Sequence, residues 1–170
     1  MEYPQRQTIF LAIFLPILLL VIGGALLQQG ILRNIQSGGQ QEVGWLASSA
    51  WVISLLCPLP FGLWLGLKWH GRHPTAYVLI GLFVGLIGMF AYRIMIGITI
   101  LPVIGRPPDA VDWLWWFTQY TLLSTFLYAV GGLVGDSLAG RIREEWITPL
   151  IGLAAAVITA LGSTIAALSA

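Results

Sequence analysis

The stretch TAYVLIGLFVGLIGMFAYRIMIGITILPVI, residues 75–104, decides the fold class of this chain, because Arg93 is the only formal charge in its 30 residues. A helix needs about 20 predominantly apolar residues to cross a hydrocarbon core about 30 Å thick. A run of this length and polarity is therefore typical of a transmembrane helix. It also raises the question of what a single arginine does inside the span.

The composition of the whole chain agrees with a membrane location. Of the 170 residues, 58% are hydrophobic and 9% are charged, and the mean hydropathy is +0.87, whereas soluble domains carry about 25% charged residues. The charges are clustered, and further long gaps separate them at residues 7–32, 43–67, 113–135 and 146–170. We therefore predict an all-α, polytopic membrane helix bundle of about five transmembrane helices, a single membrane domain over residues 1–170 with no soluble domain.

The expected spans follow from these gaps, and they are residues 8–27, 45–67, 76–100, 115–135 and 147–168. The first is longer than the apolar region of a secretory signal peptide, so we expect it to remain as a span. The longest linker, residues 28–44, is polar and rich in glycine and is expected to form a solvent loop. Linkers this short leave no room for a catalytic domain outside the membrane.

The distribution of lysine and arginine predicts the orientation, because cytoplasmic loops retain these residues. With five spans, one side carries Arg6, Lys68, Arg72, Arg141 and Arg143, and the other carries Arg33 and Arg106. We therefore expect a cytoplasmic N-terminus and an external C-terminus, in a cell (inner) membrane. Residues 113–116, WLWW, then lie at the outer interface, which suits the amphipathic indole ring.

Arg93 has two interpretations. At about 1.5 Å per residue it lies roughly 25 Å beyond Ala76, in the outer part of the bilayer, where a charge costs less than the about 2.5–3.5 kcal/mol expected at the centre. In the interpretation that we favour, its side chain extends outward to lipid phosphate or to Asp112. In the other, it faces the bundle interior and binds an anionic group, with a hydroxyl supplied by Tyr92 or Tyr120.

Pro58 and Pro60 lie near the middle of the second expected span. Each proline removes a backbone N–H and crowds the preceding turn, so the helix is expected to kink or break here. Broken helices form binding sites in many transporters, but a kink packed against its neighbours is the commoner outcome and the one we favour. Cys57, beside the break, is the only cysteine, so it cannot form an intrachain disulfide and is expected to be a buried thiol.

Pairs of glycines four residues apart recur in three consecutive spans, and such pairs let two helix backbones approach closely in lipid. They are Gly62 and Gly66, Gly81 and Gly85, and Gly131 and Gly135. We expect the third and fourth spans to form a close pair. The last span is rich in small residues throughout, so it is expected to pack either within the bundle or against a partner.

Few residues suggest catalysis or cofactor binding. His70 and His73 are three residues apart, but the intervening glycine and the following proline favour a turn, so we predict no metal site and no other cofactor. Asp136 is expected to cap a following helix or to pair with Arg141 or Lys68. The sequence shows no nucleophile paired with a base and no basic run suited to nucleic acid, so we predict neither catalytic residues nor a nucleic-acid partner.

Three functions remain possible, because the sequence shows neither a family motif nor an internal repeat that would distinguish them. We favour a non-catalytic accessory or assembly subunit of a membrane complex, whose partners are the lipid bilayer and other membrane helices in a homo-oligomer or a larger complex. A small oligomeric channel or carrier would use Arg93 and the helix break at Pro58 and Pro60. An interfacial lipid-modifying enzyme would need His70, His73 and Asp136 to converge.

Overall fold

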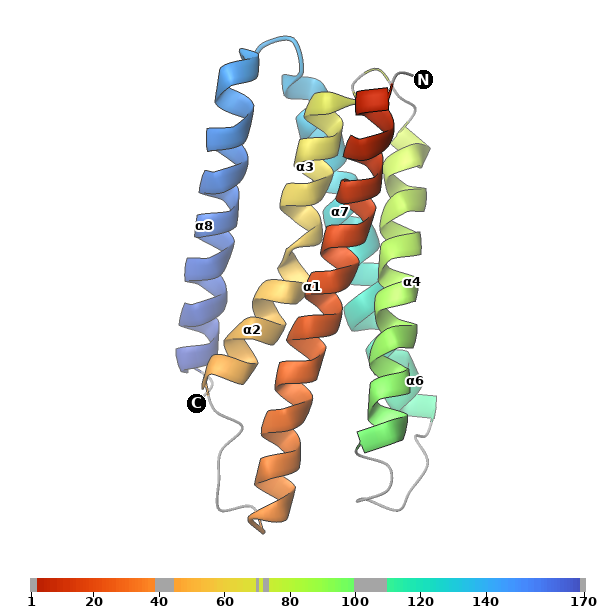
Figure 1. Ribbon diagram of the computed structural model, residues 1–170, viewed down its shortest axis with the longest axis vertical. Helices are drawn as coiled ribbons and strands as arrows, with labels where there is room; N and C mark the ends of the chain where they lie inside the picture. Colours follow the sequence, from red (N-terminus) through yellow and green to blue (C-terminus); the bar gives the residue numbers. More distant parts are fainter. Residues whose placement is uncertain (1–2, 39–44, 70, 72–73, 100–109, 169–170) are drawn as a thin grey trace.

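The computed structural model describes residues 3–38, 45–69, 71, 74–99 and 110–168, and every regular element in these ranges is a helix (Figure 1). In chain order the elements are α1 (Tyr3–Gln36), α2 (Trp45–Leu56), α3 (Pro58–Lys68), α4 (Pro74–Thr99), α6 (Ala110–Trp116), the π-helix η1 (Phe117–Leu122), α7 (Leu123–Leu138) and α8 (Glu144–Leu168).

Five segments of the described chain are long and apolar enough to cross a membrane. They are Gln7–Gln36, Ala47–Lys68, Pro74–Ile98, Val111–Leu138 and Glu145–Thr164. The predicted all-α, polytopic bundle is therefore confirmed. The N-terminus and the C-terminus lie toward opposite ends of the bundle, as an odd number of spans requires (Figure 1).

Close helix packing places α7 between α3 and α4. Between α3 and α7 the backbones themselves are in contact, because a Cβ added to Gly66 would overlap the carbonyl oxygen of Gly132. One added to Gly135 would lie 3.0 Å from the Gly66 Cα, and one added to Gly131 would lie 2.8 Å from the Leu63 nitrogen. The second span is thus joined to the fourth through glycines on both helices.

The third and fourth spans also pack closely, but through a different stretch of the fourth. A Cβ on Gly81 would lie 2.9 Å from the Thr125 Cα, and one on Gly85 would lie 2.7 Å from the Thr121 Cα. Gly131 and Gly135 face α3 and not α4. The sequence shows which glycines allow close approach, whereas the neighbour that each one meets depends on the rotation of the helix about its axis.

α1 continues nine residues past its expected end at Leu27, which corrects the prediction of a solvent loop for residues 28–36. Gln28 is buried, and Ile31 and Leu32 pack against the core. Ile31 and Leu32 follow Gln28 at three and four residues, so the inward face of the helix continues through them. The polar residues on the opposite face therefore do not terminate the helix. With 34 residues, α1 is about 51 Å long, and its end projects beyond the other helices (Figure 1).

The second span is divided at Cys57, where α2 ends and α3 begins in a different direction (Figure 1). Both prolines lie in the first turn of α3, where backbone N–H groups have no intrahelical acceptor, so their absence costs no hydrogen bond. Cys57 is buried, and its thiol donates to the carbonyl oxygen of Pro16 in α1 at 3.8 Å. The break is thus packed against α1.

α1 passes through its own proline, Pro16, without ending. A proline at this position leaves the carbonyl of Ala12, four residues earlier, without its intrahelical donor. The Tyr128 hydroxyl of α7 donates to this carbonyl at 2.9 Å, and Tyr128 is fully buried. A polar contact in the apolar core thus ties the first span to the fourth.

Candidate functional site

Arg93 lies six residues before the end of α4, at the end of the bundle where α6 begins. Its guanidinium carbon is 5.2 Å from the centroid of the Trp113 ring and 5.5 Å from that of Trp116. Both distances are within the range of cation–π attraction. The two indoles are three residues apart on one face of α6, and their rings meet edge to face with centroids 5.8 Å apart.

The Nε atom of Arg93 is buried and has no hydrogen-bond acceptor among the described residues. A guanidinium carries five N–H donors in one plane, and cation–π contacts involve its charge without using these donors. A buried donor without an acceptor costs about 1–3 kcal/mol. Arg93 therefore retains the capacity to bind an oxygen ligand in the plane of its guanidinium.

Tyr92 lies on the interior side of α4 and is 6% exposed. Its ring stacks on Tyr120 with centroids 5.0 Å apart and meets Trp116 edge to face at 6.4 Å. The Tyr120 hydroxyl accepts a hydrogen bond from the Trp51 indole nitrogen at 3.2 Å. Trp116 thus contacts both Arg93 and the aromatic stack of the core.

Asp112, which we considered as the ion-pair partner of Arg93, lies in the first turn of α6 and directly precedes Trp113. The aromatic contacts of the guanidinium are instead with the indoles of Trp113 and Trp116. From the sequence we expected these tryptophans at the lipid interface and did not predict their contact with Arg93. A signal was present, because Trp113, Trp116 and Tyr120 follow one another at three and four residues, a spacing that places all three on one helix face.

The π-helix η1 begins directly after Trp116. Short π segments are frequent at functional sites, because their wider turn changes which side chains face a neighbouring helix. Here the segment carries Tyr120 and Thr121, both buried against α4, where the Thr121 hydroxyl lies 3.9 Å from the Met89 sulfur. The fourth span therefore combines a π turn, the aromatic stack and the indoles that hold Arg93.

The other predicted site residues lie away from Arg93. The break at Pro58 and Pro60 lies near the middle of the bundle, whereas α6 lies at one end (Figure 1). At the opposite end, the Asp136 carboxylate accepts a hydrogen bond from the Gly71 backbone N–H at 2.6 Å, which ties α7 to this residue between α3 and α4. His70 and His73 are outside the described residues, in which no group of three or more histidine, cysteine, aspartate or glutamate side chains could hold a metal ion.

α8 forms a second surface of interest because it covers only one edge of the bundle. It packs on α2 and α3 through Ile147, Ile158 and Gly162, and a Cβ on Gly162 would lie 2.6 Å from the Ile53 side chain. Only 18% of its most apolar stretch is buried within the bundle, against 50% for the second span. On its outward side lies the small-residue face, which consists of the exposed residues Gly152, Ala155, Ala156, Thr159 and Ala160.

The fold and these surfaces define a multi-pass helical membrane protein. The chain matches no protein-family model, no curated protein and no solved structure.

Proposed function

We propose that the protein is a non-catalytic accessory or assembly subunit of a membrane complex, and that α8 binds a transmembrane helix of the partner protein. The observation that supports this proposal is the small-residue face of α8. In lipid, helices associate mainly by close packing, and small side chains allow their backbones to approach.

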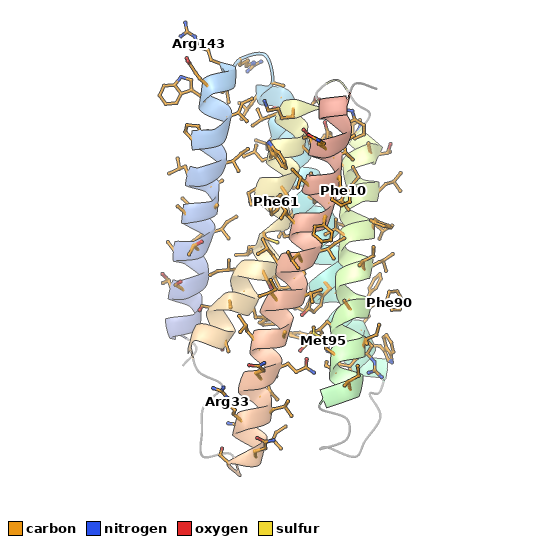
Figure 2. The ribbon with its side chains drawn as sticks, in the orientation of Figure 1. Phe10, Arg33, Phe61, Phe90, Met95 and Arg143 are labelled. Carbon is orange, nitrogen blue, oxygen red and sulfur yellow. The ribbon has the colours of Figure 1, made fainter. Side chains whose placement is uncertain are left out.

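The outward faces of the other helices show what a lipid-exposed surface of this protein looks like. On α4 the exposed side chains include Leu79, Phe83 and Phe90, which are 62%, 52% and 54% exposed. Phe90 points outward from α4 (Figure 2). On α1 they include Phe10, Phe14 and Ile22. Large side chains fill the space between lipid tails, whereas the small-residue face of α8 is shaped for another helix.

The face has a matched control on the same helix. Gly152, Ala156 and Ala160 follow one another at four residues, and so do Leu153, Val157 and Leu161 on the adjacent stripe. All six residues are exposed. A Cβ added to Gly152 would meet nothing within 4 Å. Added bulk on either stripe should therefore leave the bundle itself intact.

We also propose that the N-terminus is cytoplasmic, because the ends of the spans on that side carry more lysine and arginine. Arg33 and Arg143 lie at opposite ends of the bundle, as five spans require in either orientation (Figure 2). The protein would then reside in a cell membrane with α6 and the end of α1 on the outer side. In this orientation the Arg93 site opens toward the outer leaflet.

The channel or carrier remains the second candidate, favoured by the buried Nε of Arg93, for which the described part of the chain supplies no acceptor. Its two expected elements do not form one site, because the break packs on α1 while Arg93 contacts α6. A transport pathway would have to connect different levels of the bundle (Figure 1). The accessory-subunit proposal needs no such connection.

The test is purification of the tagged protein from native membranes in mild detergent, followed by mass spectrometry of stoichiometric companions. Ala156→Leu should remove the partner and Val157→Leu should retain it, because both add bulk to exposed positions but only the first lies on the small-residue face. A partner retained equally by both variants would overturn the assignment of the face. Self-association that depends on Ala156 would support helix docking but would contradict an accessory role.

A further inference from the structure

We infer that Arg93, Trp113 and Trp116 form a binding site for a phosphate group at the membrane interface. The evidence is the placement of one guanidinium near the end of a span, its contacts with two indoles, and a buried Nε that no described residue pairs with. The inference is independent of the proposed partner of α8, because the two surfaces involve different helices.

The depth of the site suits a headgroup ligand. Arg93 is the only formal charge in α4, and at about 1.5 Å per residue it lies about 9 Å from the end of that helix. α6 carries Trp113 and Trp116, which contact the guanidinium, and Trp115, which is 58% exposed. Tryptophan concentrates where the hydrocarbon core meets the headgroups. The guanidinium can therefore reach the layer in which lipid phosphates lie.

The two indoles restrict the guanidinium without using its hydrogen-bond donors. Cation–π attraction acts through the ring faces of Trp113 and Trp116, and the planar fork of an arginine suits bidentate binding of two phosphate oxygens. An arginine held in this way loses less side-chain freedom when it binds a ligand than one that moves freely in the headgroup layer.

The unpaired Nε distinguishes this arrangement from an arginine that only extends to water. This donor is buried and has no acceptor among the described residues, so hydration of the terminal nitrogens alone does not satisfy it. Because Nε is buried in this conformation, a phosphate reaches it only after a small movement of the side chain; one phosphate oxygen would then supply its acceptor, while a second binds a terminal nitrogen. The shared chemistry is a phosphate oxyanion, supplied either by a phospholipid headgroup or by free phosphate.

The chain offers a matched control for the charge. Arg33 is exposed in the last turn of α1, at the same end of the bundle as α6 (Figures 1 and 2). Arg33→Gln removes a positive charge from the same side of the membrane but leaves the indole-bound guanidinium intact. Non-specific attraction of anions to this end of the protein should weaken equally in Arg33→Gln and Arg93→Gln.

The experiment measures binding of phosphatidylglycerol, and of diacylglycerol with the same acyl chains, to the delipidated protein in a maltoside detergent by native mass spectrometry. Phosphatidylglycerol should bind more tightly than diacylglycerol, and Arg93→Gln should weaken its binding by about tenfold or more, whereas Arg33→Gln should not. A parallel calorimetric titration with inorganic phosphate distinguishes the sources. Arg93-dependent binding of phosphate would assign the site to a soluble ligand, and binding of the lipid alone would assign it to a headgroup.

Equal binding of the two lipids, or equal losses in Arg93→Gln and Arg33→Gln, would overturn the inference. If the uncharged variant fails to accumulate, Arg93→Lys replaces it in the test, because lysine keeps the charge and should keep the fold. It should bind phosphatidylglycerol more weakly than the wild type, because an ammonium cannot reproduce the planar fork. Full binding by a folded Arg93→Lys protein would contradict the proposed geometry.

Discussion

The hydrogen bond from Tyr128 to Ala12 gives a quantitative test of how this bundle manages a proline inside a span. Pro16 cannot donate to the Ala12 carbonyl, and the Tyr128 hydroxyl at 2.9 Å replaces the missing donor. Tyr128→Phe keeps the ring and removes only this donor. A buried acceptor left unpaired costs about 1–3 kcal/mol, and hydrogen bonds between membrane helices average about 0.6 kcal/mol with a maximum near 1.7. We therefore expect Tyr128→Phe to destabilise the protein by about 1 kcal/mol.

The same substitution in a Pro16→Ala background isolates the cause. Alanine at position 16 restores the backbone N–H, so the Ala12 carbonyl regains its intrahelical donor and the tyrosine becomes dispensable. The assay is reversible unfolding by sodium dodecyl sulfate in mixed micelles, followed by circular dichroism for the four proteins of the cycle. A coupling of about 1 kcal/mol is expected. Independent sites show coupling free energies of up to about 0.3–0.5 kcal/mol. A value in that range would refute the explanation, whatever the destabilisation caused by each single substitution.

Three further predictions concern packing, topology and the helix break. Gly66→Ala should destabilise the bundle by about 1–3 kcal/mol, since its Cβ would overlap the Gly132 carbonyl, whereas Gly152→Ala should be neutral or slightly stabilising in the same unfolding assay. Single cysteines at Gln40 and Pro108 should react with an impermeant thiol reagent from outside the cell and one at Gly71 should not, because buried Cys57 gives little background; the reverse pattern would overturn the proposed orientation. Replacing Pro58 and Pro60 together by alanine should change the melting temperature modestly and leave partner binding intact, and loss of function in a folded double variant would instead support a binding site at the break.

The positions of the spans could be predicted from the sequence because a charge inside the hydrocarbon core is costly. The gaps between charged residues therefore predict the spans, and a described helical segment long and apolar enough to cross a membrane overlaps each of them. The end of α1 was predicted wrongly, since the polar residues after Leu27 lie on a helix whose inward face continues through Ile31 and Leu32. Polarity alone does not distinguish a loop from a helix that projects past the membrane.

The neighbours of each side chain could not be predicted, because sequence gives the depth of a residue in the bilayer but not the rotation of its helix. The position of Arg93 near one end of its span followed from counting, whereas its contact with Trp113 and Trp116 depends on how α6 meets α4. Gly131 and Gly135 were recognised as packing residues, yet their partner is α3. The π turn after Trp116 gives no sequence signal comparable to a proline, since its residues, FTQYTL, include neither proline nor glycine.

The most direct test of the proposed helix docking is a photo-cross-linking scan of α8 in native membranes. A photoreactive residue at Gly152, Ala156 or Ala160 should cross-link to one defined membrane protein, and one at Leu153, Val157 or Leu161 should react with lipid. Mass spectrometry of the adducts identifies the partner and the helix that it contributes. Lipid adducts at all six positions would contradict an accessory role for this surface of the protein.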